Sequence, residues 1–128
     1  MSKIEIWFPT CIYIEDNLLS NDEKENLINK CYEIKKNTNK GGNHWISNVY
    51  NTQGTYNISE DINFKLLKNK ITDHVNAFAK LFETTNIYST NDGWLNVYKK
   101  TDYQESHFHS GSIFSVVYFL SAPKGSGN

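Results

Sequence analysis

Residues 93–120, GWLNVYKKTDYQESHFHSGSIFSVVYFL, decide the fold class of this chain. From Gly93 onward the apolar period changes from helical to extended, and strands are expected at 94–98, 105–109 and 112–120. The run from Pro123 to Gly127 has the composition of a turn. The C-terminal third is therefore predicted to be a β-meander.

Two amphipathic helices are predicted before this region. Ser20 and Glu23 form a capping box, and an apolar stripe then follows, so a helix is expected over roughly 21–36. Ser59, followed by two acidic residues, starts a second helix at about 60–83. Its apolar positions repeat at intervals of three and four: Phe64, Leu67, Ile71, Val75, Phe78 and Phe82. Short strands are expected at 4–8 and 11–14, and an extended segment at 44–50.

The bulk composition is that of one folded domain. The chain has 128 residues, of which 38% are hydrophobic and 14% aromatic, enough for a single core. The net charge is −1, and the lysines are interspersed with acidic residues, so no nucleic-acid partner is expected. All 13 basic residues are lysine, because the sequence contains no arginine.

The cysteines and the N-terminus indicate the cellular compartment in which the protein is expected. Cys11 and Cys31 form no CxxC motif, which is typical of reduced thiols in a cytosolic protein. The N-terminus lacks an apolar signal core, and no apolar run approaches the length of a membrane span. A cytoplasmic protein with no membrane partner is expected.

Glu105, His107 and His109 alternate along one predicted strand, which places their side chains on one face. Two imidazoles and a carboxylate are the ligands of the non-haem iron facial triad, and zinc also accepts them. The alternative is that the two histidines are solvated or hydrogen-bonded on a half-exposed strand.

Several motifs resemble those of the Fe(II)/2-oxoglutarate-dependent dioxygenases. The pattern N-x-Y at 96–98 is followed after eight residues by H-x-H at 107–109, and ESHFH stands where prolyl 4-hydroxylase-like members have EPHFD. The stretches FPT at 8–10, GWLNVY at 93–98 and HFHSGSIFSVVYFLSAPKGSG at 107–127 are similar to oxygenases of phages and marine bacteria. The resemblance runs from Phe8 to the end of the chain and is strongest over 93–127.

The resemblance implies an α+β fold in which N-terminal helices pack on a double-stranded β-helix, or jelly roll, that looks incomplete. Residues 1–128 would form one domain, with strands and two helices in 1–89 and the start of the jelly-roll core in 90–128. It implies a hydroxylase-type oxygenase that uses Fe(II) and 2-oxoglutarate on a small molecule or a peptide side chain. An exposed strand edge at 112–120 would allow a homo-oligomer.

By position, the resemblance makes His107 the first metal ligand and places His109 where most members have aspartate. Asn96 and Tyr98 match positions that contact 2-oxoglutarate, although ordinary strand residues would look the same. Tyr118 would face the same cavity from the next strand, or fill the core.

The chain also departs from the family pattern. No histidine follows His109, and Lys124 is the only later cation, so the distal histidine and the cation that pairs with 2-oxoglutarate are missing. The sequence is therefore expected to be the N-terminal part of an oxygenase. His44 is the spare imidazole with a route to the site, His74 is expected on a helix surface, and Glu105 could restore the carboxylate.

The alternative function is a non-catalytic binding module, either a degenerate oxygenase or a cupin-like β-sandwich. The cupin version is weaker, because the cupin motif continues with a glutamate that residues 110–115 do not supply.

Overall fold

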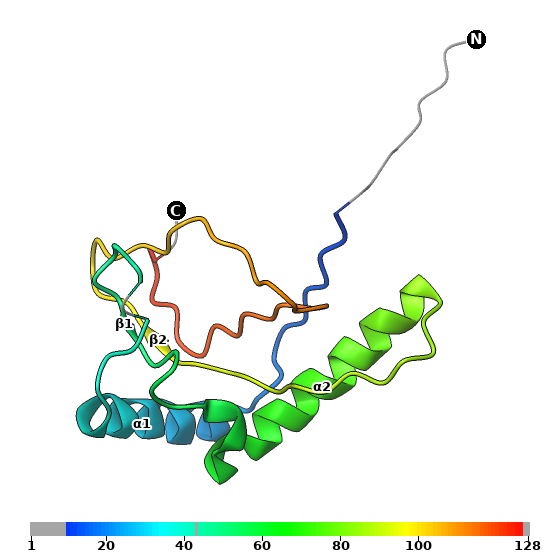
Figure 1. Cartoon of the computed structure of the whole chain (residues 1–128). Helices are drawn as coiled ribbons and strands as arrows, with labels where there is room; N and C mark the ends of the chain where they lie inside the picture. Colours follow the sequence, from blue (N-terminus) through cyan, green and yellow to red (C-terminus); the bar gives the residue numbers. More distant parts are fainter. Residues whose placement is uncertain (1–9, 43, 127–128) are drawn as a thin grey trace.

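Two helices and one small antiparallel sheet are the regular elements of the structure. It is a computed structural model that describes residues 10–42 and 44–126. The helices are α1 (Asn21–Asn37) and α2 (Lys65–Ala79), and the strands are β1 (Tyr50–Asn51) and β2 (Asn96–Val97). In Figure 1 the two helices lie along the lower side of the view, and the segment after β2, drawn in orange and red, loops across the upper side.

The first helix confirms the prediction made from its capping box. The Ser20 hydroxyl accepts from the Glu23 backbone N–H at 3.2 Å, and the Glu23 carboxylate accepts from the Ser20 N–H at 2.6 Å. These two bonds satisfy backbone donors that have no partner within the helix. The buried stripe of α1 consists of Leu27, Cys31 and Ile34. Neither helix in the described part of the chain is both long and apolar enough to cross a membrane.

The second helix is shorter than the predicted 60–83, because its ends tighten into 3₁₀ turns. These turns are η1 (Ile58–Glu60) and η2 (Ile62–Phe64) before α2, and η3 (Lys80–Phe82) after it. The Asn57 side chain accepts from the Ser59 N–H at 3.0 Å, and the Asp61 side chain accepts from the Asn63 N–H at 2.8 Å. Side chains of this type hold local turns in competition with a regular helix, which delays the start of α2.

The core lies between α1 and the start of α2. Six buried side chains form it: Leu19, Leu27, Cys31, Ile34, Phe64 and Leu67. Partly buried residues from later in the chain pack against it, among them Leu95, Tyr118 and Leu120. The contacts of Tyr118 and Leu120 bring the segment after β2 back to the helices.

The strands are shorter and fewer than predicted. β1 and β2 pair with Tyr50 opposite Val97, so the expected segments 44–50 and 94–98 contribute two residues each. The strands expected at 11–14, 105–109 and 112–120 were wrong, because the structure assigns none there. A strand needs a neighbour for its backbone groups, and within the described chain no backbone-to-backbone bond joins 113–120 to another segment. The strand expected at 4–8 lies outside the described residues, and the jelly roll stays a prediction.

Candidate functional site

The structure brings together the side chains of His107 and His109. Their Nε2 atoms lie 3.1 Å apart, and their ring centroids are separated by 5.0 Å. The segment that carries them is not a strand, so these contacts come from a loop conformation rather than from strand alternation. The other ring nitrogen of His107, Nδ1, lies 2.7 Å from the backbone carbonyl oxygen of Glu105.

Two tryptophans flank the histidine pair. The Trp45 ring meets the His107 ring edge-on, with centroids 4.8 Å apart and an interplanar angle of 85°. The Trp94 ring stacks on His109 at 5.6 Å and 12°. All four rings line one cavity of about 460 Å³. The cavity wall is therefore aromatic on both sides of the imidazole nitrogens.

The position of Trp45 depends on a tight loop before β1. Gly42 has a φ of +60°, and a Cβ added there would lie 2.6 Å from Trp45 Cδ1. The Trp45 indole N–H donates to the Gln53 side-chain oxygen at 3.3 Å, and the Gly42 N–H donates to the Gln53 carbonyl at 3.0 Å. A glycine is required because it adopts this φ without strain and lets the indole approach the backbone.

The residues expected to bind 2-oxoglutarate lie elsewhere. None of the three contributes to the wall of this cavity. The Asn96 side chain accepts from the Asn51 amide at 2.5 Å, and the Tyr98 hydroxyl donates to the Gln104 side chain at 2.8 Å. Tyr118 packs against the core, where burial and the nearby Glu23 carboxylate raise its pKa.

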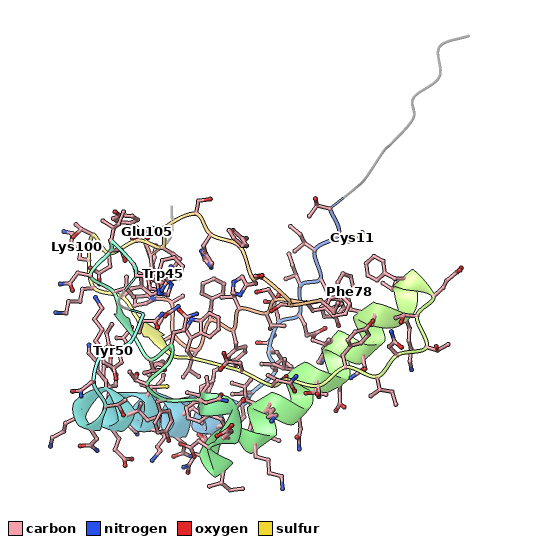
Figure 2. The ribbon with its side chains drawn as sticks, viewed as in Figure 1. Cys11, Trp45, Tyr50, Phe78, Lys100 and Glu105 are labelled. Carbon is pink, nitrogen blue, oxygen red and sulfur yellow. The ribbon has the colours of Figure 1, made fainter. Side chains whose placement is uncertain are left out.

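The remaining candidate ligands are divided between the cavity and other places. His44 lines the cavity and packs on Trp45, with ring centroids 4.8 Å apart. His74 lies on α2, where its Nδ1 is 2.7 Å from the Tyr13 hydroxyl. The Glu105 carboxylate also borders the cavity, but it accepts a hydrogen bond from the Ser47 backbone N–H. Trp45 and Glu105 are both labelled above the small sheet in Figure 2.

The histidine pair fits one divalent cation as two neighbouring ligands. Two nitrogens that each lie about 2.1 Å from one ion at a right angle are separated by about 3.0 Å, close to the 3.1 Å observed. Across residues 10–42 and 44–126, no group of three or more histidine, cysteine, aspartate or glutamate side chains is placed to hold a metal ion. The described site is therefore a two-imidazole donor set.

The chain gives no match to protein-family models, to curated proteins or to solved structures. The sequence interpretation had missed Trp45 and Trp94 as parts of this site. The available signal was that each tryptophan closely follows glycine, at Gly42 and at Gly93, where the chain can turn tightly.

Proposed function

We propose that the chain, alone or as part of a longer protein, is an Fe(II)- and 2-oxoglutarate-dependent oxygenase of the hydroxylase type. The single observation that carries the proposal is the 3.1 Å separation of His107 Nε2 and His109 Nε2 inside an aromatic cavity. Neutral imidazole is a ligand of both iron and zinc, and the motifs around the pair resemble those of this oxygenase class. Fe(II) and 2-oxoglutarate, when bound, would supply the chemistry by which O₂ oxidises a substrate.

In this proposal His107 and His109 hold the metal, and the protein supplies the surroundings. Trp45 and Trp94 restrict the orientations of the two imidazole rings, which reduces the entropy lost on binding. They also keep part of the cavity apolar, which strengthens electrostatic interactions inside it. Asn96, Tyr98 and Tyr118 keep their proposed role toward 2-oxoglutarate as part of a jelly roll. That role requires a different arrangement, because in this structure none of them lines the cavity.

The proposed substrate is a small molecule or a peptide side chain, and the proposed location is the cytoplasm. Both cysteines are free thiols, which supports a reducing compartment. Homo-oligomer formation through residues 112–120 also belongs to the proposal. Val116, Val117 and Phe119 in that segment are exposed, and its backbone groups form no ladder in the described chain.

The test is an anaerobic Fe(II) titration with and without 2-oxoglutarate, followed by the visible charge-transfer band of the ternary complex. The proposal expects a band that disappears in His107→Ala and persists in His74→Ala. His74 is the matched control because it lies on α2, outside the cavity wall. A folded wild-type chain without the band, or an unchanged band in His107→Ala, would overturn the proposal.

A second candidate is a metal-binding module without turnover. The observation that favours it is the donor set, since the described residues gather two imidazoles while the Glu105 carboxylate binds the Ser47 N–H. Release of succinate from 2-oxoglutarate separates the two candidates. The oxygenase releases it in the presence of Fe(II) and O₂, and the module binds Fe(II) but releases none.

A further inference from the structure

We infer that Glu105 is a positioning residue that fixes the His107 imidazole through two different groups. Its carboxylate ties the segment 105–109, here called the histidine segment, to the loop at Ser47. Its backbone carbonyl holds the proton of His107 on Nδ1. The inference deepens the proposed function and rests on it for its metal-binding consequence, whereas the two hydrogen bonds themselves do not depend on a metal.

The first step is the anchor. The Glu105 carboxylate accepts from the backbone N–H of Ser47, a residue 58 positions earlier in the chain. Ser47 is 6% exposed, and Val49 two residues later is 4% exposed, so the donor belongs to a buried part of the loop. A hydrogen bond to an ionised carboxylate is stronger than one between neutral groups.

This anchor matters because the histidine segment has few other attachments. Within the described chain, no backbone-to-backbone hydrogen bond links residues 105–109 to another element. The two ring contacts, of Trp45 with His107 and of Trp94 with His109, restrict the rings but involve no hydrogen bond. Across the residues that the structure describes, the hydrogen bond that joins this segment to a distant residue is therefore the one made by the Glu105 side chain.

The second step is the proton on His107. A carbonyl oxygen only accepts hydrogen bonds, so the ring nitrogen 2.7 Å from Glu105 O must be the donor, Nδ1–H. The neutral ring then presents a lone pair at Nε2, the atom that lies 3.1 Å from His109 Nε2 and that would bind a metal ion. Histidine ligands of metals commonly donate their other N–H to a carbonyl or carboxylate, which fixes the tautomer and the ring orientation.

The third step joins the two groups of Glu105. The carbonyl that accepts from His107 belongs to the residue whose side chain is held at Ser47. Removal of the side chain frees the backbone at 105, and the carbonyl then no longer has a fixed position under His107 Nδ1. Glutamine keeps an oxygen acceptor at the same reach, whereas aspartate keeps the charge but is one methylene shorter.

The experiment compares Glu105→Ala, Glu105→Asp and Glu105→Gln with Asp92→Ala as the matched control. Asp92 is another carboxylate on the wall of the cavity, but it is exposed, and in the described part of the chain no hydrogen bond joins it to the histidine segment. Long-range ¹H–¹⁵N spectra of the histidine rings, recorded without added metal, report the tautomer of His107. Thermal unfolding verifies that each variant is folded.

We expect His107 in the Nδ1–H form in the wild type, in Glu105→Gln and in Asp92→Ala, and a shift toward Nε2–H in Glu105→Ala and Glu105→Asp. Zn²⁺ affinity should fall about 10- to 100-fold in the alanine and aspartate variants and recover in glutamine. An unchanged His107 tautomer in folded Glu105→Ala would overturn the inference. The expected tautomers in a wild-type chain that binds no Zn²⁺ or Fe(II) would support the positioning role and overturn the proposed function.

Discussion

The Trp94 ring stacks on the His109 ring with centroids 5.6 Å apart and an angle of 12° between their planes. Because this indole is so near a proposed metal ligand, it should report directly on the occupant of the site. Co²⁺ is paramagnetic and quenches nearby indole fluorescence. We therefore expect Co²⁺ to lower the tryptophan emission. The Co²⁺ affinity obtained from this quenching should equal the affinity obtained by competition with a chelating dye.

The control for this first prediction is Trp94→Phe. The intensity lost on Co²⁺ addition should fall substantially in this variant, while the affinity measured with the dye changes little. Trp45 still lies beside His107 and accounts for the quenching that remains. Equal losses of intensity in the variant and the wild type would place the bound Co²⁺ away from the histidine pair.

Thr52 should be a large contributor to the stability of the loop that holds the site. Its side chain is fully buried, and its hydroxyl donates to the Tyr56 carbonyl at 3.1 Å and accepts from the Leu95 N–H at 3.0 Å. Thr52→Val keeps the shape but leaves both backbone groups unpaired. The free energy of unfolding should fall by about 1–3 kcal/mol in urea denaturation.

The same substitution at Thr55 is the control for Thr52. Thr55 is exposed, and its hydroxyl donates a shared bond to the Asn39 carbonyl at 3.0 Å and the Thr52 carbonyl at 3.1 Å. Water can replace that bond, so Thr55→Val should cost clearly less. Equal costs at the two positions would contradict the assignment of Thr52 as a buried link between β1 and the segment before β2.

Local patterns in the sequence were enough to predict the helices. The Ser20–Glu23 box and the stripe that follows it act within a few residues of each other, and α1 forms where they indicated. The delayed start of α2 was also encoded locally, by the side-chain turns at Asn57 and Asp61. Those residues compete with helix formation, a preference that the apolar period alone does not show.

The site depends on contacts that a local pattern does not contain. The spacing of His107 and His109 indicated that their side chains meet, and they do, but through a loop and not through a strand. Strand residues form a strand only beside a partner, so a run such as 112–120 cannot predict its own pairing. The bond from Ser47 to Glu105 joins residues far apart in the chain, and no spacing rule indicates it.

Gly42 and Gly54 offer a matched pair for testing whether the loop at Gly42 fixes the position of Trp45 on the cavity wall. Both have positive φ, +60° and +77°, so alanine is strained at either position. A Cβ at Gly42 would also lie 2.6 Å from Trp45, whereas a Cβ at Gly54 meets nothing within 4 Å. Gly54→Ala should cost about 1–2 kcal/mol from the backbone alone. Gly42→Ala should lower the free energy of unfolding in urea by more than this and should shift the Trp45 emission maximum. Equal losses for the two variants, with unchanged emission, would contradict the packing of Trp45 against Gly42.

The hydrogen bond between Tyr56 and Asp61 predicts a specific alkaline behaviour. The Tyr56 hydroxyl donates to the Asp61 carboxylate at 2.6 Å, and this bond, with burial, raises the pKa of Tyr56 to about 12 from an ordinary value of 10.0. A raised pKa of an acid means that the neutral form is favoured in the folded state. Its contribution to stability is therefore complete below pH 10 and is lost as the pH rises through about 12.

Tyr56→Phe removes this contribution at every pH. At pH 7 the variant should unfold with a free energy about 1–2 kcal/mol lower than the wild type, because a bond to a charged acceptor is lost. Between pH 10 and pH 12 the wild type should lose stability faster than the variant, so the difference between them narrows. Tyr32→Phe, on the exposed face of α1, is the control and should run parallel to the wild type over this range. A constant difference between Tyr56→Phe and the wild type up to pH 12 would show that Tyr56 ionises equally in both states, against the observed bond.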